Sequence, residues 1–210
     1  MYKRQHLRME GKYYVQKETD PYDQKHIHVQ FYLTDGRVVR YHDTRKFGRM
    51  YVYDAKEPFE AYACFKHVGY DAFDERVTPQ YLWNAFHHRK ITLKQALLDQ
   101  SVVAGVGNIY ADEICFALGY DPRSKVSRLK KADYEAWIKE MRRILNGAIL
   151  SGGTTIRSYT SSLGVDGRFQ LKLKVHAKKG EPCLVCHTPI EKITVGGRGT
   201  YLCKTCQKRR

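Results

Sequence analysis

Residues 183–206 read CLVCHTPIEKITVGGRGTYLCKTC, and the cysteine spacing in this stretch decides how the C-terminal part of the chain folds. Cys183 and Cys186 form one CxxC pair, and Cys203 and Cys206 form a second pair, with sixteen residues between Cys186 and Cys203. Each CxxC turn points two thiolates at a common centre, so two turns supply the four ligands of a tetrahedral metal site. The stretch therefore predicts one structural Zn²⁺ without an open coordination position. Iron also accepts four thiolates, but zinc is the expected ion.

The residues between the two cysteine pairs predict a β-hairpin, because residues 196–199 read Gly-Gly-Arg-Gly. An arginine at the tip of a loop stiffened by metal can present its guanidinium to a phosphate. Arg198 is therefore a candidate contact to a polyanion, and the alternative is an ordinary solvent-exposed turn arginine. The remaining cysteines, Cys64 and Cys115, have no partner motif, so we expect both to be buried thiols.

The charge of the chain indicates the same class of partner. The sequence holds 37 Lys and Arg against 22 Asp and Glu, a net charge of +15, and residues 171–210 contain ten basic residues and two acidic ones. This excess predicts a nucleic-acid partner, with a basic surface kept only for solubility as the alternative. Neither a membrane-spanning run of ~20 apolar residues nor a signal peptide is apparent. We therefore expect a monomeric cytoplasmic protein with reduced thiols and no membrane partner.

Upstream of the cysteines, the hydrophobic period divides the chain into a β part and a helical part. Residues 26–33 alternate, with Ile27, Val29, Phe31 and Leu33 on one face, and Asp35-Gly36 predicts a hairpin turn into a strand over 37–41. A further strand is expected over 48–54. From residue 78 onward the period is helical, with the longest helix over 132–150. Residues 171–175 alternate with lysines and predict one more strand, so the fold class is α+β.

Two glycines interrupt the helical period at residues 104–108, which read Ala-Gly-Val-Gly-Asn. Backbone N–H groups at the start of the next helix, with the Asn108 side chain beside them, would form a phosphate site. The motif is weak by itself because many tight helix–helix turns use glycine. Arg89, Lys90 and Lys94, on the preceding basic segment, add weight to it.

Five segments, in the same order, resemble the formamidopyrimidine-DNA glycosylases (Fpg or MutM) of bacterial base-excision repair. The third of them resembles the helix–two-turns–helix of that family. The resemblance implies a partial N-terminal β-sandwich in residues 1–70, a helix–two-turns–helix domain with a lesion-recognition loop in residues 71–170, and a zinc finger in residues 171–210. The segments are HLRMEG at 6–11, DTRKFG at 43–48, residues 97–113, GGTT at 152–155, and residues 180–207.

The resemblance also implies roles for single residues. The family bends duplex DNA and flips a damaged purine, such as 8-oxoguanine, out of the stack. Met9, Arg45 and Phe47 match the residues that fill the vacated space and wedge the duplex, with ordinary core packing as the alternative for Met9 and Phe47. Arg198 matches the finger arginine that assists strand cleavage. The matches to DNA-contacting positions are His26, Arg45, Arg89, Lys94, Asn108 and Arg198, and those to the loop over the flipped base are Thr154, Thr155, Arg157, Ser158 and Tyr159.

The departures from the family pattern concern its catalytic groups. An N-terminal proline amine attacks the sugar in the family, a glutamate beside it moves protons and a lysine assists. Here MYKRQ precedes His6. Those five residues match the translation of an adapter end used in sequencing libraries, so we expect a truncated reading frame. His176-Ala177 replaces the usual Tyr-Gly, which removes the basis for one phosphate contact.

Three classes of function follow. The parent gene is expected to encode a glycosylase with lyase activity, whereas the polypeptide as written is expected to bind DNA without chemistry. An RNA-associated zinc-ribbon protein fits the charge and the cysteine pairs but not the ordered wedge motifs. Within the family, the endonuclease VIII branch is the nearest alternative, and residues 154–169 favour the formamidopyrimidine branch because they resemble its lesion loop.

Overall fold

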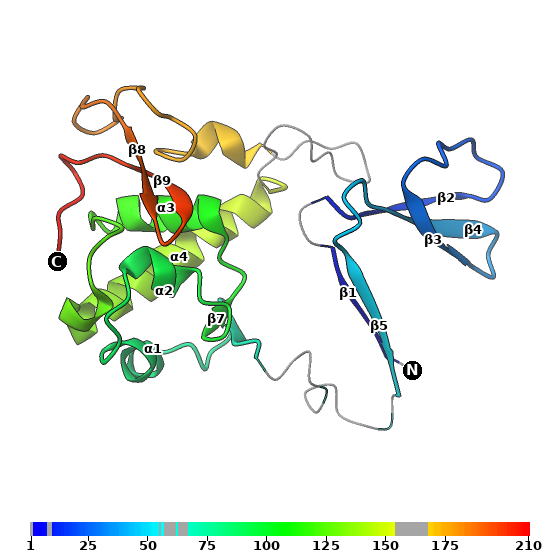
Figure 1. Cartoon of the computed structure of the whole chain (residues 1–210), viewed down its shortest axis with the longest axis horizontal. Helices are drawn as coiled ribbons and strands as arrows, with labels where there is room; N and C mark the ends of the chain where they lie inside the picture. The colour runs from blue at the N-terminus through cyan, green and yellow to red at the C-terminus, as the bar shows by residue number, and fades with distance from the viewer. Residues whose placement is uncertain (1, 8–9, 55, 57–61, 63–66, 154–167) are drawn as a thin grey trace. The chain divides into compact units, whose positions relative to one another are not determined.

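The computed structural model describes residues 2–7, 10–54, 56, 62, 67–153 and 168–210. The chain forms two compact units, one made of Met1–Tyr62 and Gly152–Gln170 and the other of Ala63–Ser151 and Leu171–Arg210. The first unit contains the N-terminal strands, and the second contains the helices and the C-terminal hairpin (Figure 1). This arrangement confirms the mixed α and β class expected from the sequence.

Among its described residues, the N-terminal unit contains five strands. A three-stranded antiparallel sheet has the order β2 (Lys12–Lys17), β4 (Arg37–His42), β3 (Ile27–Tyr32). Separately, β1 (Tyr2–His6) pairs antiparallel with β5 (Arg49–Tyr53). The predicted turn joins β3 to β4, and Gly36 has a φ of 78°, a left-handed conformation that glycine adopts without strain.

A buried arginine lies within the three-stranded sheet. Arg40 on β4 is 2% exposed, its Nε donates to Gln30 Oε1 at 3.1 Å, and its Nη1 donates to Gln16 Oε1 at 2.8 Å. The guanidinium also lies 3.5 Å from the centroid of the Tyr22 ring. Gln30 and Arg40 lie on the face opposite Val29 and Phe31, so the predicted alternation holds for these two apolar residues. The register shifts between Ile27 and Val29, and Leu33 lies beyond the strand with 38% of its surface exposed.

The second unit is built from four α-helices and two short strand pairs among the described residues. The two-stranded parallel pair joins β6 (Tyr70–Asp71) to β7 (Val103–Ala104), and the antiparallel hairpin joins β8 (Glu191–Val195) to β9 (Arg198–Leu202). No described helix is both long and apolar enough to cross a bilayer. The helices are α1 (Pro79–Phe86), α2 (Leu93–Leu97), α3 (Asn108–Ala117) and α4 (Lys131–Leu150), with short 3₁₀ helices η2 (Val126–Arg128) and η3 (Phe169–Lys172).

Local sequence accounts for where these helices begin. The Thr78 hydroxyl accepts the N–H of Tyr81 at the start of α1, and Thr92 forms a capping box with Gln95 at the start of α2. The longest predicted helix is α4, and its apolar stripe is buried, with the ring of Trp137 stacked on that of Phe86 at a centroid distance of 5.6 Å. The stripe therefore forms the core of this unit.

The strand predicted over residues 171–175 is not formed. Residues 169–172 form η3, and the backbone N–H groups of Lys174, Val175 and His176 all donate to the carboxylate of Glu113 on α3. A carboxylate that takes consecutive N–H groups removes the donors that a strand would offer to a neighbouring strand. The alternation reflects burial of Leu173 and Val175 against this unit rather than a sheet.

Candidate zinc centre and nucleic-acid interface

The four cysteines of the two CxxC pairs form a compact cluster. Their sulfur atoms all lie within 4.8 Å of one another, with Sγ–Sγ distances of 3.8 Å for Cys183–Cys206 and 3.3 Å for Cys186–Cys203. Four sulfurs at roughly 2.3 Å from a central zinc would be roughly 3.8 Å apart, so the donor set fits one ion. The predicted ligand set is brought together as a closed, structural type of site.

The thiols of this cluster are electrostatically unequal. Hydrogen bonds from Thr188 lower the pKa of Cys186 to about 6, whereas burial raises the pKa of Cys203 and Cys206. Bringing four thiolates together without a cation is unfavourable, and a dication at the centre removes that cost while the ligands lose their protons. Metal binding and folding of this module are therefore coupled.

The β8–β9 hairpin is fixed on α3 by a second buried carboxylate. Asp112 Oδ1 accepts from Lys94 Nζ at 2.6 Å, and Asp112 Oδ2 accepts from His176 Nδ1 at 2.7 Å and from the N–H of Tyr201 at 3.2 Å. Lys94 and Asp112 are both 0% exposed. Figure 1 shows the hairpin beside α3, the helix that carries Asp112.

Burial of Lys94 corrects one expectation. This lysine was predicted to contact a DNA phosphate, but its ammonium group also donates to Gly199 O at 3.0 Å and to Thr200 Oγ1 at 2.7 Å. Three acceptors match the three protons of a lysine ammonium. A side chain that is fully buried and fully bonded is not available to a phosphate, so Lys94 instead supports the hairpin.

Arg198 and Asn108 adjoin this support, because Gly199, the residue after Arg198, accepts from both Lys94 and Asn108. Arg198 is exposed at the first position of β9, directly after the Gly196-Gly197 turn. Asn108 begins α3, and its Nδ2 donates to Gly199 O at 3.1 Å, while its Oδ1 is among three buried side-chain atoms of the described residues that have no hydrogen-bond partner. The hairpin backbone is thus bonded directly to the start of α3.

The hairpin tip also packs closely on α2. Gly196 has a φ of +56°, and a Cβ built on it would lie 2.8 Å from Gln95 Cγ. Another residue here would have to adopt this left-handed conformation and displace the Gln95 side chain, so glycine is favoured. Arg89, which was predicted to contact DNA, precedes α2 in the sequence and is exposed. Its Nη1 donates to Asp99 Oδ2 at 2.7 Å, so it belongs to a surface ion pair.

In the N-terminal unit, residues 43–48 form a tight loop around one buried carboxylate, which we call the wedge loop. Asp43 is 1% exposed, its Oδ1 accepts the N–H of Arg45 at 3.0 Å, and its Oδ2 accepts the N–H of Gly48 at 2.8 Å and the hydroxyl of Tyr41 at 2.9 Å. Burial by itself would raise the pKa of Asp43, but these hydrogen bonds outweigh it and lower the pKa. The carboxylate therefore stays ionised and holds the loop closed.

The same loop presents the two predicted wedge residues to solvent. The Phe47 side chain is 54% exposed, and the Arg45 guanidinium lies 4.7 Å from the centroid of its ring. The alternative of core packing for Phe47 is therefore excluded. Gly48 ends the loop, and a Cβ there would lie only 1.7 Å from the Tyr41 hydroxyl, so the close approach requires glycine.

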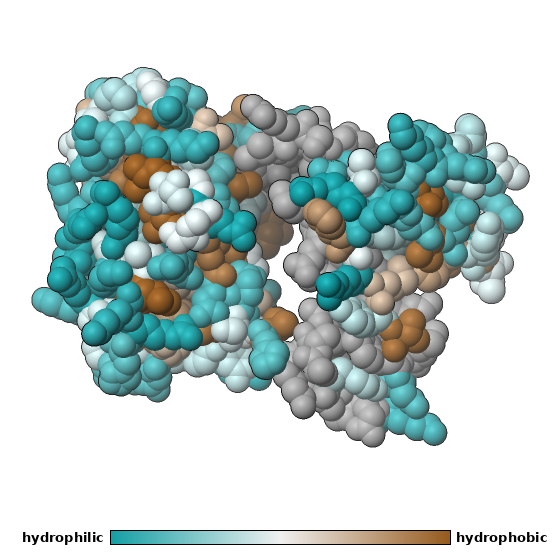
Figure 2. Space-filling view, in the orientation of Figure 1, coloured by the Kyte–Doolittle hydropathy of each residue, from teal (hydrophilic) through white to brown (hydrophobic). Residues whose placement is uncertain are grey.

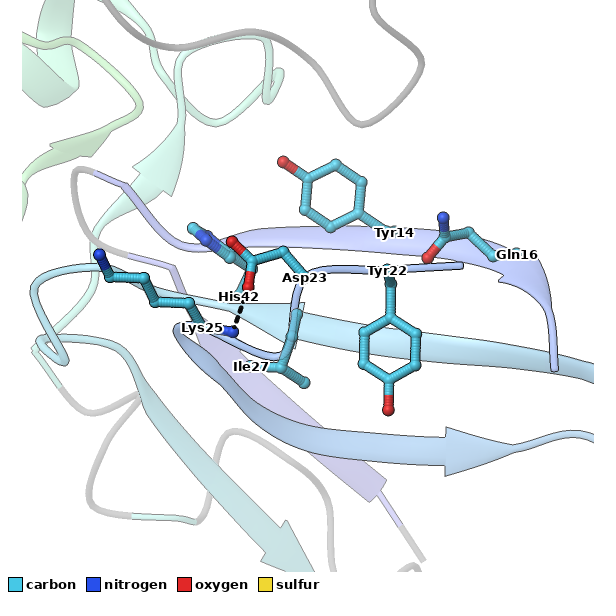
Figure 3. Close-up of a pocket in the computed structure, with 7 residues that line it drawn as sticks. All are labelled: Tyr14, Gln16, Tyr22, Asp23, Lys25, Ile27 and His42. Atoms are coloured by element: carbon cyan, nitrogen blue, oxygen red, sulfur yellow. Dashed lines mark hydrogen bonds between the residues drawn. The ribbon is translucent and has the colours of Figure 1, made fainter. Parts of the chain in front are cut away.

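His26 contacts His42, which lines a small hollow in the same unit. Its φ is 69°, and its ring meets that of His42 with centroids 5.7 Å apart. Burial, followed by the nearby His26, lowers the pKa of His42, so this ring is neutral near pH 7. Figure 3 shows His42 with Tyr14, Tyr22 and Lys25 around the hollow, which has a volume of about 230 Å³.

Some predicted residues lie outside the described part of the chain. These are Met9, Cys64 and the loop residues Thr154, Thr155, Arg157, Ser158 and Tyr159. Cys115 is described and is fully buried, as expected. In Figure 2, hydrophilic side chains dominate the visible face of the helical unit, with scattered apolar ones between them.

Sequence reasoning missed the acidic residues that hold the site. Asp43 could have been found, because an aspartate two residues before a backbone N–H is a common turn signal. Asp112 and Glu113 carry no such signal, since consecutive acidic residues on a helix usually face water. Both are buried here, at 0% and 6% exposure.

Comparison with known proteins agrees with this geometry. Three family profiles match in order: the N-terminal domain of formamidopyrimidine-DNA glycosylase over residues 4–50, its H2TH domain over residues 68–160, and the zinc finger found in FPG and IleRS over residues 180–209. The formamidopyrimidine-DNA glycosylase of Bacillus licheniformis is 44% identical over 204 residues, which cover 97% of this chain and 74% of that protein. The formamidopyrimidine-DNA glycosylase of Oceanobacillus iheyensis is 45% identical over 202 residues, which cover 96% of this chain and 71% of that protein.

Solved structures give the same result. The Lactococcus lactis Fpg bound to DNA containing an abasic site superposes with a TM-score of 0.87 at 33% identity, covering 97% of this chain and 73% of that one. The Lactococcus lactis G226P mutant bound to Fapy-dG DNA gives a TM-score of 0.83 at 35% identity and the same coverage. With its ordered domains, its four-cysteine cluster and relatives of this similarity, the chain belongs to the formamidopyrimidine-DNA glycosylase family.

Proposed function

We propose that this chain binds damaged duplex DNA as a base-excision repair protein of the formamidopyrimidine type. The observation that carries the proposal is the exposed Arg198 on a hairpin whose backbone is bonded to the start of α3. The first N–H groups of a helix have no partner within it and favour anions. Arg198 and the start of α3 would therefore contact the phosphates of one strand together.

The wedge loop supplies the second part of the proposal. An exposed phenyl ring with a guanidinium stacked on it can enter a base stack, and the guanidinium can face the base left without a partner. Met9 would add to this wedge, and residues 154–159 would cover the flipped base. The remaining contacts proposed are those of His26 and Arg89 to phosphates. The same proposal places the domain boundaries at residues 70 and 170. It also has one copy of the chain bind one DNA site, in the nucleoid.

Salt dependence of DNA binding tests the phosphate contacts. Affinity for a duplex with an abasic-site analogue is measured from low to moderate salt for the wild type, Arg198→Ala and the matched control Lys139→Ala, which removes one exposed charge from α4. Each phosphate contact contributes roughly −0.9 to the log–log slope. Arg198→Ala should flatten the slope by about one, whereas Lys139→Ala should not. Equal slopes for all three proteins would contradict the role of Arg198.

A polypeptide of residues 1–210 is proposed to bind the lesion without excising it. The resemblance implies a nucleophilic proline amine with a glutamate beside it, and the residues before His6 offer neither. Positioning of the reacting amine supplies much of the acceleration in covalent catalysis. Single-turnover reaction with an 8-oxoguanine:cytosine duplex under borohydride should therefore trap no adduct.

Joining an N-terminal family segment that begins with proline and glutamate to His6 should restore that adduct. An adduct formed by residues 1–210 and abolished by blocking the Met1 amine would instead show that Met1 acts as the nucleophile. The formamidopyrimidine branch is favoured over the endonuclease VIII branch by the names of the relatives. Comparing 8-oxoguanine with an oxidised pyrimidine in the joined protein separates these branches.

A further inference from the structure

The ion pair between Lys94 and Asp112 differs from an ordinary buried pair in what it touches. Its groups make three bonds to consecutive residues of β9: Lys94 Nζ to Gly199 O at 3.0 Å, Lys94 Nζ to Thr200 Oγ1 at 2.7 Å, and Asp112 Oδ2 from the Tyr201 N–H at 3.2 Å. These bonds reach the backbone and side chain of the strand immediately after Arg198. The pair is therefore placed to set the position of the hairpin.

One further bond connects the pair to Arg198 itself. Thr200 is fully buried, and its hydroxyl accepts from Lys94 Nζ and donates to the carbonyl oxygen of Arg198 at 2.9 Å. The Thr200 hydroxyl thus connects Lys94 to the backbone of Arg198, which also pairs with Val195 in the hairpin, while the Arg198 side chain remains exposed. A hydroxyl that accepts one bond and donates another has a defined orientation, which transmits the position of the ammonium group to the strand.

His176 fixes the other side of the carboxylate. Its Nδ1 donates to Asp112 Oδ2 at 2.7 Å, its ring packs edge-on against Tyr201 with centroids 4.9 Å apart, and its side chain is 11% exposed. The backbone N–H of His176 is held in turn by Glu113. Asp112 is consequently bonded on both oxygens, by groups from α2, β9 and the segment that follows η3.

From this geometry we infer that Asp112 is a positioning residue for Arg198: its carboxylate, held by Lys94 and His176, places the guanidinium against the DNA phosphate. The inference rests on the proposed function, because it needs Arg198 to contact DNA. Buried charge networks are not required for stability as such, since an apolar replacement is often neutral. If the network places the Arg198 side chain, its loss should change DNA affinity, which can be measured.

A double-mutant cycle on DNA affinity tests the inference. Arg198→Ala should weaken binding to the abasic-site duplex about tenfold and flatten the salt slope by about one. Asp112→Asn should reproduce most of both changes, and the double variant should bind no more weakly than Arg198→Ala alone. Two losses that multiply in the double variant would overturn the inference.

A lower fraction of folded protein would not mimic this result, because it changes the number of binding sites but not the salt slope. Zinc content and the stoichiometry of DNA binding are therefore measured for every variant. Asp74→Asn is the matched control, since Asp74 forms an exposed pair with Arg76 in the same unit, and it should leave the slope unchanged. If Asp112→Asn fails to fold, the charge-neutral pair Lys94→Met with Asp112→Asn takes its place in the cycle.

The double variant Lys94→Met with Asp112→Asn removes the bonds from Lys94 to Gly199 and Thr200 without leaving a buried charge. It should hold one zinc and show the flattened slope, with no further effect of Arg198→Ala. A full Arg198 effect in that background would overturn the inference while leaving the proposed function intact. The proposed function fails separately if Arg198→Ala alone leaves wild-type binding and its slope unchanged.

Discussion

The wedge loop and the β8–β9 hairpin both present an exposed arginine, but they are held in opposite ways. Asp43 holds the wedge loop through groups two and five positions away along the chain. The hairpin is held by bonds to Lys94, Asn108 and Asp112, which lie 89 to 106 positions away. One element is closed locally, and the other depends on the tertiary structure of its unit.

The difference predicts how each element fails. Closing a short loop costs little chain entropy, so a local loop forms whenever its few hydrogen bonds are available. The hairpin needs the zinc, because a four-cysteine module of this size folds only with its metal, and its position depends on bonds to Lys94 and Asp112 in distant parts of the chain. Perturbations of the hairpin should therefore be large and cooperative, and those of the wedge loop small and confined to it.

Removing zinc should have the largest effect. Structural zinc contributes on the order of 10 kcal/mol to the folding of small four-ligand modules. Chelation, or Cys203→Ser, should therefore disorder residues 181–208 and abolish the Arg198 contribution to the DNA salt slope. Zinc content and amide exchange of the hairpin provide the measurement. One full equivalent of zinc bound by Cys203→Ser would show that the four-thiolate site is wrong.

Lys94→Ala should have the second largest effect. Removing one partner of a buried ion pair leaves an uncompensated charge, here that of Asp112, and costs about 3–5 kcal/mol. The free energy of unfolding is read from tryptophan fluorescence in urea, because both tryptophans, Trp83 and Trp137, belong to the helical unit. Lys90→Ala removes an exposed neighbouring charge and should change stability by less than about 0.5 kcal/mol. Equal effects of the two variants would mean that Lys94 is exposed in solution.

Asp43→Asn should have a moderate and local effect. The amide cannot accept all the N–H and O–H groups that the carboxylate receives, and an unmet buried donor costs about 1–3 kcal/mol. Amide exchange should accelerate at Arg45 and Gly48, while the tryptophan-monitored unfolding of the helical unit stays unchanged. Asp35→Asn, in an exposed turn of the same unit, should leave both amides protected. Slow exchange in Asp43→Asn would refute the local control of this loop.

Phe47→Ala should be nearly neutral for stability and informative for binding. The ring is exposed, so its loss should change the free energy of unfolding by less than about 0.5 kcal/mol. Preference for an abasic-site duplex over an undamaged one should fall about tenfold, because stacking on a base is worth about 1–3 kcal/mol. The salt slope should remain that of the wild type. Tyr32→Ala removes another exposed ring of this unit and serves as the control, and an equal loss there would argue against a specific wedge.

The amino-acid sequence determined the features that depend on neighbouring residues. Threonine caps fixed the starts of α1 and α2, the period of apolar residues fixed the buried stripe of α4, and the CxxC spacing fixed the zinc ligands. Each of these signals acts over a few residues or within one hairpin. The resemblance to a known family rested on the same short motifs, and the comparisons bear that family out.

Only the tertiary structure decided which charged side chains face water. Lys94 was expected to reach a phosphate and is instead enclosed by residues about a hundred positions away. Residues 171–175 have the alternation of a strand, but Glu113 takes their N–H groups before a sheet can form. A carboxylate or an ammonium group is buried only where distant groups bond it on every side. Sequence spacing reveals local order, whereas the partner of a buried charge is known only when the chain has folded around it.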